Sequence, residues 1–264
     1  MPAVDPARLR LQIDRVLEDF NTPGLFHRRL QDLFSQYANR ALRFGEETHS
    51  PSLMPTFHLP DPLILQLKLD LNPLIKAHPT LSLELSDELW QSDYFEIRMV
   101  ASHILSRVPV KDPEPILTRL ERWLTPDLDT KLASELLSKG AQNLAGSHPH
   151  SWELFLEAFL TRNNPKMNAL GVMGFRESLD HTEFRNLPVI FRKISPFVQD
   201  PQFELMSPLR DLIENLAEKF PEETLYFLKQ SMTLSDSPIM MRLIKQCLPF
   251  FEGDVQDQLK AALR

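Results

Sequence analysis

The feature that most constrains the fold is a spacing of polar, turn-like segments that recurs through the second part of the chain. These segments begin near residues 92, 127, 164, 200 and 236, so the steps between them are 35, 37, 36 and 36 residues. Most periods contain a second break near their middle, at Asp112-Pro113, His148-Pro149, Phe220-Pro221 and Phe251-Glu252-Gly253. Each period therefore has room for two helices. A fixed spacing of helix pairs is typical of an α-solenoid, in which each pair packs on its neighbours.

Apolar residues within the periods are spaced as in amphipathic helices. In residues 92–105 the apolar stripe consists of Ile97, Val100, Ala101, Ile104 and Leu105, and Leu243, Ile244, Cys247 and Leu248 repeat it near the end of the chain. A polar turn, an aliphatic residue beside an arginine, a small residue and a final leucine resemble the HEAT repeat. The predicted fold is therefore all-α, a right-handed solenoid of stacked antiparallel helix pairs, in other words a HEAT-like or armadillo-type superhelix.

The remainder of the chain fits one continuous domain, 1–264. We expect N-terminal helices at 1–43, a loop at 44–62 and stacked helix pairs at 63–264. Asp5-Pro6 and Thr22-Pro23 each place a capping side chain before a proline at the first helical position. The loop is predicted because Pro51, Pro55, Pro60 and Pro62 leave no room for a helix. Residues 80–85 alternate as in a strand, but leucines at every fourth position favour a helix.

Composition narrows the classes of function. The net charge of −7 argues against a protein that coats nucleic acid through overall positive charge, although a local basic stripe remains open. A single cysteine, Cys247, fits a reducing compartment, and no signal peptide or membrane-spanning run is visible, so we expect a cytoplasmic protein. We expect no cofactor and no metal, since there is no nucleotide-binding fingerprint and no His-Glu-x-x-His motif. His148 and His150 are read as a solvated pair.

Two groups of charged residues are candidates for function. Asp127 and Asp129 lie at the start of a predicted helix, where a carboxylate caps the helix or, alternatively, acts as a catalytic group. Basic side chains near the start of successive repeats line one face of a solenoid and are candidates for binding a phosphate backbone; they are Arg98, Lys131, Lys166, Arg210 and Arg242. The alternative is a solvated helix face with local ion pairs.

From about Phe57 to Met232 the chain resembles the HEAT-like DNA alkylation repair family. The residues that carry the resemblance are Phe57–Pro62, Glu88–Arg98, which contains the family's Leu-Trp pair as Leu89-Trp90, and Asn215–Pro221. Enzymatic members of this family excise alkylated bases from DNA in a concave, basic cleft. The resemblance therefore implies an all-helical solenoid and DNA as the ligand.

The family's catalytic residues are only partly matched. Its Trp-Asp-x-x-Asp run corresponds to Leu124–Asp129, where an aspartate remains at Asp129 and Thr125 replaces the tryptophan. Ala169 stands at the position of the family's arginine, and a second cleft tryptophan corresponds to a position near Asp211.

Three functions remain open from the sequence. The first is a member of the family that lacks base excision and binds DNA weakly through the repeat-start cations. The second is a scaffold that binds a protein partner, which the net charge favours. The third is an active alkylpurine DNA glycosylase with Asp127 or Asp129 as the key carboxylate. None of the three requires a membrane or a metal.

Overall fold

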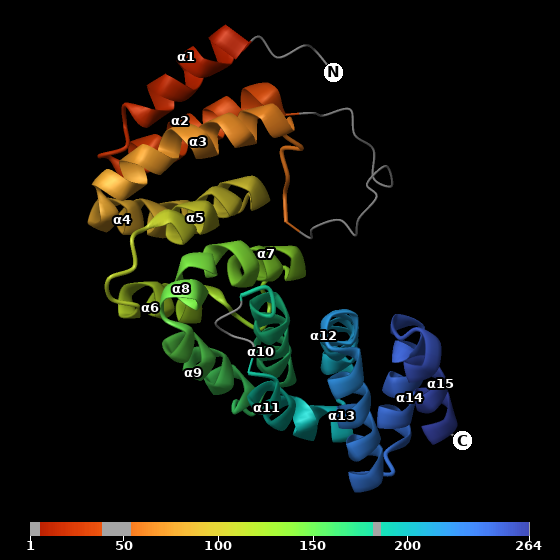
Figure 1. Ribbon diagram of the computed structural model, residues 1–264. Helices are drawn as coiled ribbons and strands as arrows, with labels where there is room; N and C mark the ends of the chain where they lie inside the picture. The colour runs from red at the N-terminus through yellow and green to blue at the C-terminus, as the bar shows by residue number, and fades with distance from the viewer. Residues whose placement is uncertain (1–5, 39–53, 182–185, 264) are drawn as a thin grey trace. The chain divides into compact units, whose positions relative to one another are not determined.

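The computed structural model describes residues 6–38, 54–181 and 186–263, and the regular secondary structure of these residues is entirely helical (Figure 1). The all-α class is thereby confirmed. The strand alternative for residues 80–85 is wrong, because they lie within the helix α4, Pro79–Trp90. Asp5 and the first part of the predicted loop, residues 44–53, lie outside the described residues. Residues 54–60 of that loop are irregular, but the predicted loop end at residue 62 is wrong, because Asp61 and Pro62 form the start of α3, Asp61–Ala77, where proline is tolerated.

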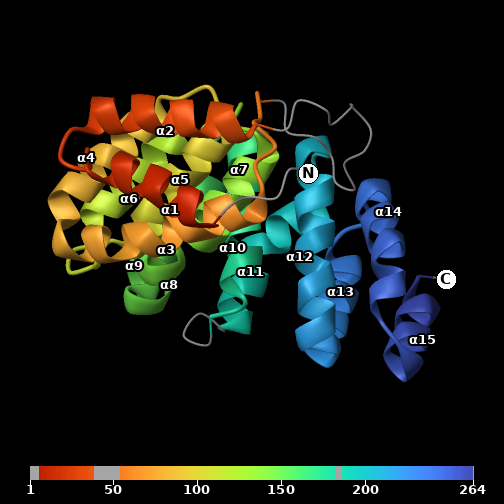
Figure 2. The same ribbon diagram turned by 90° about the horizontal axis from the view of Figure 1, so that it is seen from above.

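Contacts divide the chain into two compact units, one formed by residues up to 123 with 128–144, the other by 124–127 with residues from 145 onward. The helices of the first unit are α1 (Pro6–Leu17), α2 (Pro23–Tyr37), α3, α4, α5 (Phe95–Arg107), α6 (Glu114–Trp123), α7 (Thr130–Glu135) and the π-helix η1 (Leu136–Gly140). α1, α3, α5 and the α7–η1 segment pack side by side as one layer, and α2 packs on α4 in a second layer (Figure 2).

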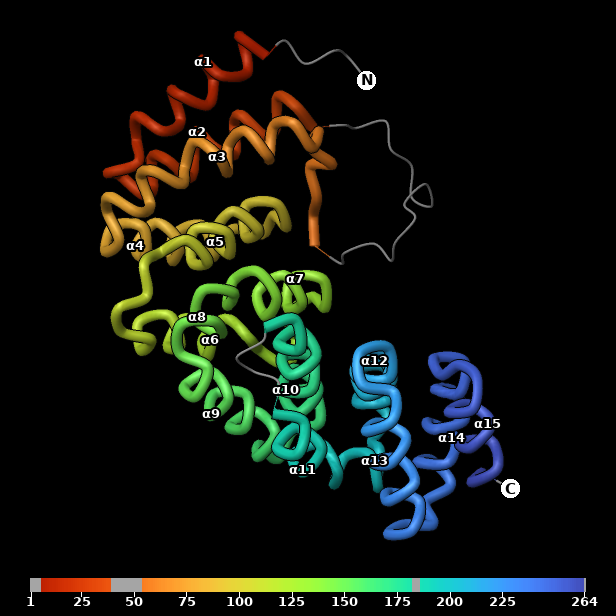
Figure 3. Tube along the Cα trace, in the orientation of Figure 1, coloured from red at the N-terminus to blue at the C-terminus, as the bar shows by residue number. Residues whose placement is uncertain are grey.

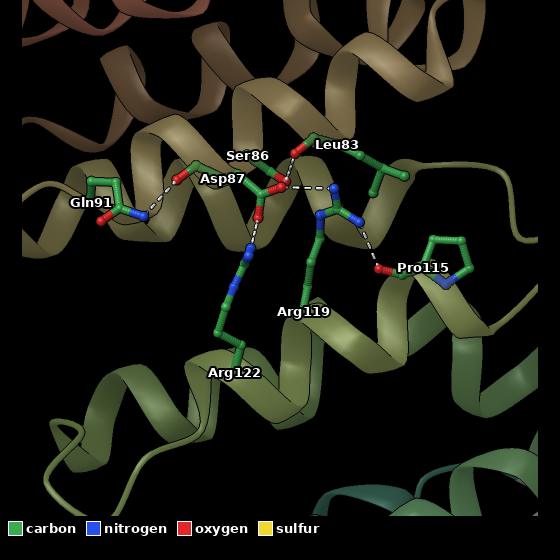
Figure 4. Close-up of polar contacts among 7 residues, drawn as sticks. All are labelled: Leu83, Ser86, Asp87, Gln91, Pro115, Arg119 and Arg122. Atoms are coloured by element: carbon green, nitrogen blue, oxygen red, sulfur yellow. Dashed lines mark hydrogen bonds and ion pairs between the residues drawn. The ribbon is translucent and has the colours of Figure 1, made fainter.

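The side chains of α6 dock on α4 through an aromatic stack and an ion-pair cluster. The rings of Trp90 and Trp123 lie 4.4 Å apart with an angle of 8° between their planes. Asp87 on α4 accepts a hydrogen bond from Arg119 at 2.7 Å and also pairs with Arg122, both on α6 (Figure 4). The stack is buried while Arg122 is exposed, so the aromatic contact contributes most of the stability of this junction.

A buried carboxylate fixes the irregular segment that precedes α3. Glu96, at the start of α5 and only 8% exposed, accepts hydrogen bonds from the backbone N–H groups of Phe57 and His58, each at 2.8 Å. The Phe57 ring stacks on Tyr94 at 4.1 Å, and His58 has a φ of 53°. Glu96 therefore satisfies two backbone donors that no helix or sheet would satisfy.

The second unit has the same two-layer arrangement. Its helices are α9 (Pro149–Leu160), α10 (Pro165–Ser178), α11 (Leu187–Gln199), the 3₁₀ turn η3 (Phe203–Leu205), α12 (Met206–Lys219), α13 (Pro221–Leu234), α14 (Pro238–Cys247), the 3₁₀ turn η4 (Leu248–Phe250) and α15 (Gly253–Ala262), while α8 (Gln142–Ser147) lies across the boundary of the units. α10, α12 and α14 are neighbours in one layer, and α11, α13 and α15 are neighbours in the other (Figure 3).

The predicted repeat boundaries coincide with helix starts. Proline occupies the first position of α4, α9, α10, α13 and α14, where its missing N–H is no loss. Four of the five periods contain two α-helices as expected, but the period from 127 to 164 holds α7, η1, α8 and α9. The expected cap at Thr22 is wrong in one respect, because its side chain makes no capping hydrogen bond. The superhelical stacking and the single continuous domain stay predictions.

No helix in the described part of the chain has both the length and the apolar character required to cross a bilayer. The same residues contain no group of three or more His, Cys, Asp or Glu side chains placed to hold a metal ion.

Candidate nucleic-acid interface

Asp129 is the N-cap of α7. Its Oδ1 accepts hydrogen bonds from the backbone N–H groups of Lys131 at 3.0 Å and Leu132 at 3.2 Å. A carboxylate at this position also interacts favourably with the helix dipole. Of the two carboxylates expected at this helix start, Asp129 is the one that caps the helix, because two helical N–H groups point at its side chain.

Asp127 is 87% exposed and pairs with a residue far along the chain. Its Oδ1 lies 2.8 Å from Nζ of Lys166, in the first turn of α10. This hydrogen bond is the main cause that raises the pKa of Lys166; the charge of Asp127 adds to it, and the charge of Glu204 contributes further. The structure thus brings one predicted catalytic residue and one predicted phosphate-binding residue together. Because both are exposed, an incoming anion can displace the carboxylate at little cost.

Arg98 lies in a packed environment between α4 and α5. Its Nε donates a hydrogen bond to the carbonyl of Ser92 at 2.7 Å, and its guanidinium lies 5.3 Å from the ring centroid of Trp90. Burial lowers the pKa of Arg98, and the charge of Asp93 partly opposes this effect. These contacts order the turn at the start of a repeat, which favours a structural role.

The other predicted cations differ in how free they are. Arg210 on α12 bonds to the adjacent Asp211, with Nη2 at 3.1 Å and Nε at 3.3 Å from Oδ1. Arg242 on α14 is exposed and has no ion pair among the described residues, and the Lys131 side chain on α7 is half-exposed with none there either. Lys166, Arg210 and Arg242 therefore lie on three neighbouring helices of one layer, while Arg98 and Lys131 belong to the other unit.

All three tryptophans of the chain lie in the core. Trp90, Trp123 and Trp152 are 8%, 2% and 0% exposed, and Trp152 Nε1 donates a hydrogen bond to Oγ of Ser178 at 2.7 Å. Ala169, at the position of the family's arginine, is nearly buried within α10. None of these residues offers an aromatic face or a guanidinium to a base at the surface.

A cluster of cations that the sequence analysis did not select lies in the first unit. Lys68 on α3, Arg107 on α5 and Lys139 on η1 all lie close enough to influence the pKa of the buried His103. The sequence does contain one indication of this cluster, because polar residues four positions apart lie on the same helix face. The pairs are Lys68 with Asn72, His103 with Arg107 and Glu135 with Lys139. The sequence does not show that these faces of α3, α5 and the α7–η1 segment lie next to one another, because this depends on how the helices pack.

Comparison with known proteins identifies the family to which the chain belongs. No curated protein sequence matches the chain. The model of the family described as DNA alkylation repair enzyme matches residues 69–242, from the middle of α3 to the middle of α14. This match covers about two thirds of the 264 residues. It includes both candidate carboxylates, Asp127 and Asp129, and all five candidate cations, the last of which, Arg242, is the final matched residue. The chain belongs to the DNA alkylation repair enzyme family.

Proposed function

We propose that this protein binds duplex DNA in alkylation repair and does not itself excise bases. The observation that carries the proposal is the placement of the tryptophans, all of which pack in the core of a protein that belongs to a DNA-repair family. Holding a cationic alkylated base requires aromatic faces at the surface, which stack on the base and attract its charge. The tryptophans here are committed to other contacts.

The carboxylates support the same conclusion. Oδ1 of Asp129 accepts hydrogen bonds from two backbone N–H groups, so the geometry of this side chain is that of a helix cap. Asp127 is exposed to water and paired with Lys166, which weakens any electrostatic stabilisation that it could give to a developing cation. An Ala at position 169 gives no anchor for a phosphate beside such a base.

The basic residues of α10, α12 and α14 support DNA binding in the second unit. Arg242 has no ion pair among the described residues and can bind a phosphate directly. Lys166 and Arg210 can bind phosphates that replace the carboxylates of Asp127 and Asp211. Exposed ion pairs contribute only about 0–1 kcal/mol, so this exchange is small in free energy. Lys131 on α7 adds a cation in the first unit.

A duplex of about 20 base pairs with a fluorescent end label is expected to bind in a salt-dependent manner. The logarithm of the binding constant should fall linearly with the logarithm of salt concentration, and Arg242→Gln or Lys131→Gln should each lower the slope by about one unit. Arg28→Gln on α2, an exposed cation of the other layer, is the control and should leave the slope unchanged. A flat anisotropy titration at 50 mM salt would refute DNA binding.

A second function, a scaffold for a protein partner, is favoured by the net charge of −7 and by the carboxylates that neutralise Lys166 and Arg210. In that case the DNA titration is flat, and a purified complex contains one defined protein partner in stoichiometric amount. Loss of this partner on Arg242→Glu, with no change in folding, would assign the contact to α14.

A further inference from the structure

Three neighbouring helices of the first unit each carry a cationic side chain in one region of their packing. Lys68 on α3, Arg107 on α5 and Lys139 on η1 belong to neighbouring helices of one layer, since α3 packs on α5 and α5 packs on η1 (Figure 1). A second polar residue lies one helical turn from each of these cations: Asn72 on α3, His103 on α5 and Glu135, the last residue of α7. These side chains form a single polar cluster, which we call the α3–α5–η1 cluster.

The close approach of η1 to α5 depends on a glycine. A Cβ placed on Gly140 would lie 2.9 Å from Oγ of Ser102 and 3.3 Å from Cδ2 of Leu136. Ser102 is fully buried and precedes His103. Gly140 therefore lets the π-helix pack against α5 at this level, which brings Lys139 into the cluster. Single π-helical turns within helices occur frequently at functional sites.

Burial and the neighbouring cations both act on the pKa values of Lys68 and His103. Burial lowers the pKa of the half-buried Lys68, Glu135 raises it, and the charges of Lys139 and Arg107 lower it further. Burial also lowers the pKa of His103 to about 4, with the charges of Lys68 and Arg107 next in effect. His103 is therefore neutral at pH 7, and its Nε2 lies 3.0 Å from Oδ1 of Asn72.

Positive charge is left unbalanced in this cluster. Glu135 is its carboxylate and pairs with Lys139 at 2.9 Å. Lys68 and Arg107 have no ion pair among residues 6–38, 54–181 and 186–263, although Glu135 attracts Lys68 at longer range. By contrast, three other partly buried cations are each paired with a carboxylate, namely Arg119 with Asp87, Lys193 with Glu157 and Lys219 with Asp180.

Burial and the charges of the exposed Arg107 and Lys139 disfavour the charged form of the half-buried Lys68, and an anion bound beside these cations offsets this effect. We infer that Lys68, Arg107 and Lys139 form a binding site for a phosphate group, whose source is the backbone of bound DNA. The single negative charge of a backbone phosphate offsets one of the two positive charges that Glu135 leaves unbalanced, and its oxygens accept several charge-assisted hydrogen bonds. The choice of DNA as the source rests on the proposed function, whereas the phosphate chemistry does not.

The first test removes the two unpaired charges. The double variant Lys68→Met/Arg107→Gln keeps most of the side-chain volume, and its slope in the salt titration of the labelled duplex should be lower by about one unit, because the site binds one phosphate. Its affinity at 50 mM salt should fall at least about tenfold, which corresponds to the loss of one charge-assisted hydrogen bond. Arg28→Gln/Lys260→Gln, on α2 and α15, removes the same total charge and should bind like the wild type.

The second test uses inorganic phosphate alone. Millimolar phosphate should raise the Tm of the wild type above its value in sodium chloride of equal ionic strength, and it should not raise the Tm of Lys68→Met/Arg107→Gln in the same way. If the wild type responds to phosphate but does not bind DNA, the site stands and the proposed function fails. If DNA binds the wild type and the double variant equally well, the proposed function stands and the site is refuted.

A third measurement excludes a loss of folding as the explanation. Lys68→Met removes a half-buried charge that repels Arg107 and Lys139, so without ligand its Tm should rise while its affinity for DNA falls. A cation that only stabilises the packing of α3 would behave in the opposite way. A lower Tm for Lys68→Met would therefore refute the site.

Discussion

Glu96→Ala is expected to lower the free energy of unfolding by about 3–5 kcal/mol, since it leaves two backbone N–H groups without their charged acceptor. The donors are Phe57 and His58, both 2.8 Å from Oε1 of Glu96, and Phe57 is buried. Without the carboxylate, nothing described in the structure takes its place as an acceptor, and the stack of Phe57 on Tyr94 loses its support. Urea denaturation followed by circular dichroism measures the effect.

Glu96→Gln is the matched control. The amide keeps a carbonyl oxygen where Oε1 lies, and the second carboxylate oxygen has no hydrogen-bond partner in the structure. The glutamine variant should therefore lose about 1 kcal/mol, the difference between a charged and a neutral acceptor. Equal losses for alanine and glutamine would show that the two backbone hydrogen bonds do not hold the segment in place.

Trp123→Ala should destabilise the protein by about 3–5 kcal/mol, the usual range for removing a large buried aromatic side chain. Trp123 is 2% exposed and stacks on Trp90, so the substitution leaves a cavity between α4 and α6. Circular dichroism in urea is again the appropriate measurement, because the substitution changes tryptophan fluorescence directly.

Trp123→Phe keeps an aromatic ring at this position and so distinguishes the effect of the aromatic stack on stability from the effect of lost side-chain volume. Nε1 of Trp123 is buried without a hydrogen-bond partner, so a phenyl ring loses no polar contact and should cost less than half as much as alanine. In a double-mutant cycle, Trp90→Ala should cost less in the Trp123→Ala background than in the wild type. A loss below about 1 kcal/mol for Trp123→Ala would mean that the ion pairs of Asp87 hold α6 instead.

Much of the helical layout could be predicted from the sequence, because its determinants are local. Proline at the first helical position fixes the starts of α4, α9 and α10. The polar segment predicted near residue 164 precedes α10, and Asn164 caps the first N–H groups of this helix. The short helices between 127 and 164 were missed, since η1 depends on the contact of Gly140 with Ser102, far away in sequence.

The candidate site was less predictable, because its contacts join distant segments. The pair of Asp127 with Lys166 spans 39 residues, and neither periodicity nor charge pattern indicates it. Arg98 lies in the first turn of α5, and the sequence pattern did not show that its guanidinium contacts the Ser92 carbonyl and the Trp90 ring. Likewise, Lys68 and Arg107 lie far apart in the sequence and come near each other only because α3 packs on α5.

The central claim is that a scaffold of the DNA alkylation repair family here binds DNA without a base-excision centre. The most direct test incubates the protein with a duplex that contains one 7-methylguanine and measures both anisotropy and released base. We predict salt-dependent binding and no release above the spontaneous rate. Asp129→Asn keeps a side-chain oxygen for the N-cap and should change neither binding nor stability. Release of 7-methylguanine by the wild type, abolished in a folded Asp129→Asn or Asp127→Asn variant, would contradict the claim.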